Sequence, residues 1–283
     1  MKIIRLAILV FVFAATLPNL LLSNDPKPKA EDLVKIELFT DHVKALPGST
    51  FLLAIKFTIQ KDWHTYWVNP GDAGLPTVVE LDLPEGWHST EIIFPIPQKI
   101  KFDEFANYGY EKEVMHMMAV TIAPNAEIGN VKIDALIKFL VCKEECLTGS
   151  KKQSFSINVS HMHEFNIDNL PIFGQFTSEL PLREHPINAE ASIIGDRLTL
   201  DLSGMELNYS KNLTFFPIEE GYMVNGAEQK LTKAGASTTF GLVLDQYREA
   251  NPERIKGLIV SDTAIIADKA NRAIYIDIPT INK

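Results

Sequence analysis

Alternation of apolar and polar residues runs through most of the chain. In residues 131–141 every odd-numbered side chain is apolar, whereas most of the even-numbered ones are polar. A period of two is typical of half-buried strands, because successive side chains of a strand point to opposite faces. Turn-forming pairs such as Pro47-Gly48 separate these runs, which favours antiparallel sheets. The same period occurs in residues 51–60, 198–202 and 274–278.

The length of 283 residues, with 46% hydrophobic content, suits about two globular domains and excludes a disordered chain. Long amphipathic helical stretches are missing, and only residues 242–256 have a pattern that fits either a short helix or a loop. We therefore expect an all-β chain, with two antiparallel immunoglobulin-like β-sandwich domains after a signal peptide. The expected boundaries are a first sandwich at 28–163, a linker at 164–185 and a second sandwich at 186–283.

The first 24 residues have the form of a secretory signal peptide. Lys2 and Arg5 form a short basic region, residues 6–17 are almost wholly apolar, and residues 18–24 provide a proline and a polar exit. The apolar run is short for a membrane span, which needs about 20 residues, although an uncleaved anchor is the alternative. We expect a mature chain that is soluble and periplasmic or secreted, a setting in which two cysteines can keep a disulfide.

The chain is acidic, which limits the partners that it attracts. Its formal charge of −9 becomes −11 once Lys2 and Arg5 leave with the signal peptide. A negative chain has no general attraction for phosphate backbones, so nucleic acid is not an expected partner. The sequence contains no Gly-x-Ser-x-Gly elbow, no His-Glu-x-x-His helix and no glycine-rich phosphate loop. We expect no cofactor.

The two cysteines, Cys142 and Cys146, lie four positions apart. Cys142 shares the even parity of Lys132 and Asp134, so without a bulge it points away from the core. In one extended strand residues i and i+4 lie about 13 Å apart, beyond the limit of roughly 7 Å for a bridge. A bridge therefore requires residues 143–145 to turn back as a tight loop or a single helical turn. So short a loop gains little stability from a bridge. A redox-active pair, a structural bridge and a metal site remain open.

Three blocks of sequence carry a family resemblance. Residues 62–76 read DWHTYWVNPGDAGLP, residues 107–114 read NYGYEKEV, and residues 139–146 read FLVCKEEC. In this order they resemble the GWHTYW-NPGD-GLP, YGYEGEV and WLVC-x3-C segments of the periplasmic N-terminal domain of DsbD-type thiol:disulfide interchange proteins. The resemblance is to the ScsB-like branch, which is associated with copper tolerance. Phe216-Pro217 and the strands after it resemble the second periplasmic domain of that branch.

The resemblance implies an immunoglobulin-like sandwich that carries its cysteines on a hairpin and relays electrons. Such a pair accepts reducing equivalents from a membrane-embedded partner domain and passes them to oxidised periplasmic proteins. DsbD-type proteins continue into membrane and thioredoxin-like domains, whereas this sequence ends at Lys283, so we expect a separate membrane electron donor. By resemblance the relay residues are Cys142 and Cys146, the flanking residues are His64 and Tyr66, and the cap loop contains Phe105 or Tyr108. Parity places His64 and Tyr66 on the face of Cys142.

A second hypothesis is a copper-handling or protein-binding module with a structural disulfide. Residues 115–118 (MHMM) and 161–163 (HMH) supply thioether and imidazole groups, which together with thiolates suit Cu(I). Alternation places Met115 and Met117 on one face of a strand and His116 and Met118 on the other, so these four cannot converge on one ion. Whether the chain is an enzyme, as a protein-disulfide reductase, is left open by the sequence.

Overall fold

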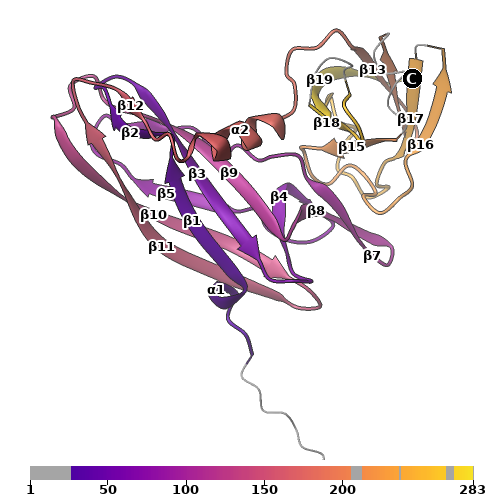
Figure 1. The fold of residues 1–283 in the computed structure, drawn as a ribbon. Coiled ribbons are helices and arrows are strands. Elements are labelled where there is room, and N and C mark those ends of the chain that lie inside the picture. Colours follow the sequence, from indigo (N-terminus) through magenta and orange to yellow (C-terminus); the bar gives the residue numbers. More distant parts are fainter. Residues whose placement is uncertain (1–26, 205–211, 236, 266–270, 283) are drawn as a thin grey trace, which may run out of the picture.

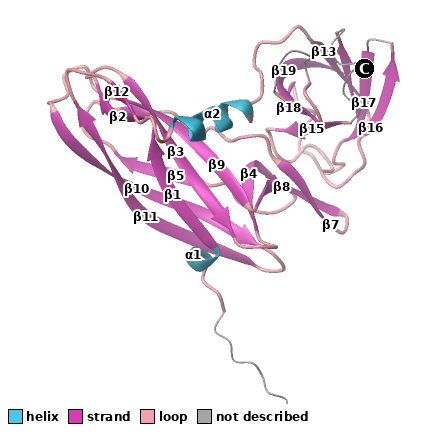
Figure 2. Cartoon of the chain, viewed as in Figure 1, coloured by secondary structure: helices cyan, strands magenta, loops and turns pink. Residues whose placement is uncertain are grey.

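The computed structural model describes residues 27–204, 212–235, 237–265 and 271–282. Within these residues the chain is nearly all β, with two short helices, which confirms the expected fold class (Figures 1 and 2). The predicted signal peptide, residues 1–24, lies outside the described residues. In the part of the chain that is described, no helix is long and apolar enough to cross a membrane.

The first part of the chain forms two sheets that enclose one core, which we call the first sandwich. One sheet has the order β1 (Val34–Thr40), β3 (Thr50–Ile59), β9 (Glu113–Thr121) and β6 (His88–Ser89), and helix α1 (Ala30–Leu33) precedes it. The other has the order β12 (Glu164–Phe165), β2 (His42–Ala45), β11 (Cys146–Val159), β10 (Gly129–Cys142), β4 (His64–Gly71), β8 (Phe105–Glu111) and β7 (Gln98–Phe102), with β5 (Val78–Asp82) paired to β10.

Parity along β10 places its apolar residues in the sandwich core, as the sequence predicts. Ile133, Ile137 and Val141 are fully buried, and they share one cluster with Phe51 and Phe57 of β3. Burying one such side chain contributes about 1.5–3 kcal/mol to folding. The core therefore fixes which face of β10 looks inward, and with it the face on which Cys142 lies.

The remaining strands form a second β unit with its own core. Its sheet is antiparallel except for one parallel pair, β13 (Asn188–Ile194) with β19 (Ala273–Asn282), which departs from the expected antiparallel arrangement. Since these strands contribute to one cluster, the sheet curls around it. Residues 244–253 contain no helix and form the loop between two strands. The strand order is β15 (Leu213–Pro217), β18 (Arg254–Ser261), β19 (Ala273–Asn282), β13 (Asn188–Ile194), β14 (Arg197–Ser203), β17 (Ser237–Val243) and β16 (Lys230–Ala234).

A helix lies within the predicted linker. Helix α2 (Leu170–Ser178) begins with a proline in its first turn, where the missing N–H costs no hydrogen bond. Phe173 and Phe176 lie three positions apart and pack on Ala54 and Met117 of the first sandwich. The helix has only nine residues, too few for a clear helical period in the sequence, so it was not among the expected elements. The domain boundaries stay a proposal.

The second β unit packs on the first sandwich through the outer face of β15 and β18. Phe216 and its cross-strand partner Leu258 belong to the core cluster of the first sandwich, whereas the neighbouring Phe215 belongs to that of the second unit. The ring of Phe216 meets those of Trp67 and Tyr108 edge to face, with centroids 6.3 and 5.2 Å apart. An apolar contact therefore joins the two units.

One core residue is a histidine without a hydrogen-bond partner. His116 on β9 is fully buried, both ring nitrogens lack partners, and the rings of Phe57, Phe94 and Tyr110 surround it. Burial lowers the pKa of His116 to about 3. Between this value and the unfolded-state pKa of about 6.5, the ring is neutral in the folded chain and protonated in the unfolded chain.

This burial makes acid sensitivity a property of His116 that can be tested. Below the unfolded-state pKa of about 6.5, stability falls as pH falls, because only the unfolded chain gains the proton. Replacing His116→Met should reduce the loss of unfolding free energy between pH 7 and pH 4.5 by about 2–3 kcal/mol. Urea unfolding across this pH range measures it. The exposed His88, replaced as His88→Met, is the matched control. An unchanged pH dependence in His116→Met would contradict the argument.

Candidate functional site

A disulfide closes the end of the longest hairpin. Strands β10 and β11 pair along their full lengths, and this register places Cys142 directly opposite Cys146. The two Cα atoms lie 4.2 Å apart and the sulfurs are bonded. Residues 143–145 turn back as a tight loop, in which the Lys143 N–H donates to the Glu145 carbonyl at 3.1 Å. The tight loop that a bridge requires is therefore present.

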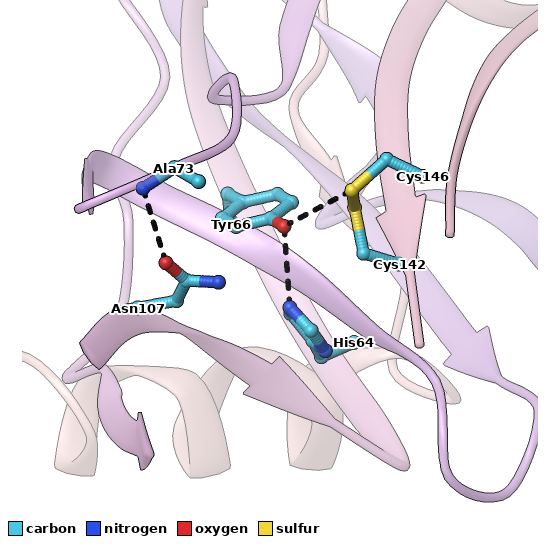
Figure 3. Close-up of a disulfide and its surroundings, with 6 residues drawn as sticks. All are labelled: His64, Tyr66, Ala73, Asn107, Cys142 and Cys146. Atoms are coloured by element: carbon cyan, nitrogen blue, oxygen red, sulfur yellow. Dashed lines mark hydrogen bonds between the residues drawn. A yellow bond between two sulfur atoms is a disulfide. The ribbon is translucent and has the colours of Figure 1, made fainter. Parts of the chain in front are cut away.

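Strand β4 brings two polar side chains to the disulfide. Cys142 pairs with His64, and Tyr66 follows on the same face. The Tyr66 hydroxyl lies 3.2 Å from His64 Nε2 and 3.8 Å from Cys146 Sγ (Figure 3). A disulfide sulfur carries no hydrogen, so in the contact with Cys146 the hydroxyl is the donor. When its proton points to the sulfur, His64 must hold its own proton on Nε2 and donate to the tyrosine oxygen.

The two cysteines differ in exposure. Cys142 is 2% exposed, although it does not belong to the core cluster of the sandwich, whereas Cys146 is exposed. Parity therefore gives the correct face for Cys142, but it does not indicate that other groups cover that face. Tyr66 and His64, at 1% and 8% exposed, are covered as well. The residue open to a partner is Cys146.

A short loop after β4 covers Tyr66. Gly74, with φ +122°, lies against the tyrosine ring so closely that a Cβ would overlap ring atoms. A hydrogen bond fixes this loop to β8: the Ala73 N–H donates to Asn107 Oδ1 at 3.2 Å (Figure 3). Gly74 and Asn107 lie in two of the family-like blocks, but no pattern in these blocks indicates their contacts. The loop thus presses on the ring whose hydroxyl meets Cys146.

Burial sets the charge states beside the disulfide. Desolvation lowers the pKa of His64 and raises the pKa of Tyr66 to about 12. Near neutral pH the imidazole is therefore neutral and the phenol keeps its proton. Two charges of the hairpin loop are paired at the surface, with Lys143 3.6 Å from Asp62 and Glu145 2.9 Å from Lys27. Exposed pairs of this kind contribute little energy.

The two predicted cap residues lie in different surroundings. Tyr108 is fully buried in the sandwich core against Phe216, and its hydroxyl donates to Asn225 at 3.0 Å. Gly109 is the residue opposite Tyr66, so Tyr108 points to the other face of β8. Tyr108 therefore packs in the core between the two units rather than over the disulfide. Phe105 is 53% exposed at the β7–β8 turn, and its role as a cap stays a prediction.

The candidate copper ligands do not converge. Met117 packs with α2, whereas Met118 lies in the sandwich core, on the same face of β9 as His116. In the other candidate segment, His163 Nδ1 lies 3.0 Å from His42 Nε2. Among the described residues, no group of three or more His, Cys, Asp or Glu side chains is arranged to hold a metal ion. Copper binding stays a prediction.

Fold and site together define a β-sandwich that carries a cross-strand disulfide at the end of a hairpin. Residues 35–157 match the family described as thiol:disulfide interchange protein DsbD, N-terminal. This match confirms the resemblance to the DsbD N-terminal domain family that the three sequence blocks indicate.

A solved structure with a similar fold is found among the periplasmic domains. The N-terminal periplasmic domain of ScsB from Proteus mirabilis superposes with a TM-score of 0.64 at 14% identity, covering 88% of this chain and 94% of that one. The reduced N-terminal domain of DsbD from Neisseria meningitidis gives a TM-score of 0.29 at 15% identity, covering 47% and 92%. No curated protein sequence matches the chain.

The contact between Gly74 and Tyr66 predicts a steric effect. In Gly74→Ala the new Cβ displaces the tyrosine ring or the loop, so we expect a stability loss of about 1–3 kcal/mol beyond the backbone cost. Gly129→Ala is the matched control, because Gly129 also has a positive φ, of +152°, but no atom would meet its Cβ. Urea unfolding compares the two variants. Equal losses would show that the ring contact contributes nothing.

Proposed function

We propose that the chain exchanges thiols and disulfides with other proteins in the periplasm, through the Cys142–Cys146 pair. The observation that carries the proposal is the asymmetric disulfide, in which an exposed Cys146 contacts the Tyr66 hydroxyl and Cys142 is buried. The match to the DsbD N-terminal family supports this assignment. We infer the periplasmic location from the same family and from the expected signal peptide.

The reduction of the pair proceeds in two displacements. A thiolate of a donor dithiol attacks Cys146 Sγ, the bond between the two cysteines breaks, and Cys142 leaves as a thiolate that takes up a proton. The second thiolate of the donor then attacks the donor's sulfur in the mixed disulfide, which releases Cys146 and leaves the donor oxidised. Two electrons thus enter the pair. The same steps in reverse pass them to an oxidised target protein.

The structural alternative is a bridge that only stabilises the hairpin. Two features weigh against it. The bond spans only four positions, so it removes little entropy from the unfolded chain. The hairpin is in addition already held by the continuous register of β10 and β11, which fixes both ends without the bond. An exchanging pair explains why the bridge lies at the exposed end of the hairpin.

Tyr66 and His64 have distinct roles in this proposal. The Tyr66 hydroxyl touches the reacting sulfur and stabilises the negative charge that forms on Cys146 when a mixed disulfide is resolved. Because the pKa of Tyr66 is raised to about 12, the group stays a donor at neutral pH. His64 is a positioning residue, since it holds the hydroxyl at 3.2 Å without contacting Cys146.

Trapping variants test whether exchange occurs and which cysteine forms the mixed disulfide. In Cys142→Ala the remaining Cys146 is exposed and has no resolving partner, so it should accumulate disulfide-linked proteins in the native compartment. Cys146→Ala leaves only the buried Cys142 and should trap far fewer. Non-reducing gels and mass spectrometry measure both, and the double alanine variant is the control. If neither variant traps a protein, the relay is wrong. More trapping by Cys146→Ala would reverse the roles.

The reduction potential gives an independent test. We expect the pair to lie above about −300 mV, the range of exchanging disulfides, whereas structural bridges lie lower. Equilibration of the purified chain with dithiothreitol or glutathione buffers, followed by alkylation of free thiols, measures the potential. A value well below about −300 mV would favour the structural bridge.

A further inference from the structure

One side chain of the second β unit bonds two elements of the first sandwich. Asn225 is 8% exposed, its oxygen accepts the Tyr108 hydroxyl at 3.0 Å, and its amide donates to Asp72 Oδ1 at 2.8 Å. Tyr108 belongs to β8, whereas Asp72 opens the loop that covers Tyr66. Both bonds bring together residues more than 100 positions apart. They are therefore a product of how the two units pack.

Neighbours of Asn225 reach the same region. The carbonyl of Ala227 accepts from Lys99 Nζ at 3.3 Å, and burial lowers the pKa of that lysine. Gly226 lies so close to the Glu104 carbonyl that a Cβ would overlap it, which explains the glycine. Lys99 and Glu104 belong to β7 and to the β7–β8 turn. The segment 225–227 thus docks on the hairpin beside the loop as well as on the loop itself.

A continuous set of contacts leads from Asn225 to the disulfide. Asp72 accepts Asn225 on one carboxylate oxygen and the Ala106 N–H, at 2.7 Å, on the other. Two residues further along the chain, Gly74 lies against the ring of Tyr66. The Tyr66 hydroxyl then meets Cys146 Sγ at 3.8 Å (Figure 3). One short loop therefore connects the Asn225 bonds to the ring of Tyr66.

We propose that the second β unit is a positioning element for the disulfide, in which Asn225 holds Asp72 and its loop so that Tyr66 stays against Cys146. The inference rests on the proposed function and gives the second unit a part in it. Asn225 and Asp72 touch neither sulfur, so both are positioning residues. Their effect is to keep a hydrogen-bond donor at the Cys146 sulfur, which favours its thiolate over its thiol when the pair is reduced.

The test measures the reactivity of Cys146 in the full chain with the Cys142→Ala background, where one thiol remains. The rate of alkylation by iodoacetamide follows the fraction of Cys146 that is thiolate. The pH profile of this rate therefore shows whether a hydrogen-bond donor stabilises the thiolate. Adding Asn225→Ala should move the profile to higher pH and slow alkylation at pH 7 by about three- to tenfold. Urea unfolding at pH 7 establishes that each variant is folded.

Two further variants separate a positioning role from general loosening of the interface. Asn225→Asp places two carboxylates together and should shift the profile as alanine does. Combining it with Asp72→Asn should restore the wild-type profile, because the exchanged pair can make the same bonds to Tyr108 and the Ala106 N–H. Asn212→Ala, which removes an exposed bond to Asp262 within the second unit, is the control and should change nothing.

The route through the ring has its own measurement. Tyr66→Phe should shift the profile by itself, and Asn225→Ala should then add no further shift. An unshifted profile in Asn225→Ala, a failed restoration in the folded exchanged pair, or an additive effect with Tyr66→Phe would each overturn the inference. None of these readouts depends on a captured partner. A failure of the trapping experiment therefore removes the proposed exchange without deciding the positioning role.

Discussion

The register of the β10–β11 hairpin is the constraint on which the site depends. Fourteen cross-strand pairs run from Gly129 opposite Val159 to Cys142 opposite Cys146. A slip of one residue would move the apolar residues of β10 out of the core and turn Cys142 inward. The burial of residues such as Ile133 and Val141 therefore also fixes the position of the two sulfurs. The same sheet places His64 beside Cys142, so packing and site geometry have one origin.

Much of this arrangement could be predicted from local pattern. The period of two in residues 131–141 predicts the strand and its inward face, and the spacing of the cysteines predicts a tight loop between them if they pair. Parity also places His64 and Tyr66 on the face of Cys142. Helix α2 was not predicted, because its nine residues are too few for a clear helical period. Its buried side chains pack against Met117 of a distant strand, and this contact is known only from the tertiary structure.

What covers a face cannot be predicted from the parity of one strand. Cys142 lies on the predicted face, yet it is only 2% exposed. Tyr108 illustrates the converse, since it belongs to the family-like block 107–114 and yet points into the core. Asp72 and Asn225 are separated by 153 positions, and no feature of either segment indicates their contact. Long-range polar contacts of this kind require the tertiary structure.

The asymmetry of the disulfide follows from how each cysteine is surrounded. Cys142 ends a strand that is flanked on both sides, by β11 and β4, and neighbouring strands limit the approach of another protein. Cys146 begins the returning strand, next to a loop that faces solvent. A thiolate from outside therefore reaches Cys146 first, and the Tyr66 hydroxyl stabilises the charge that forms on this sulfur when the mixed disulfide is resolved. Because the loop that presses on Tyr66 is bonded to the second β unit, the reactivity of this sulfur depends on the packing of the whole chain.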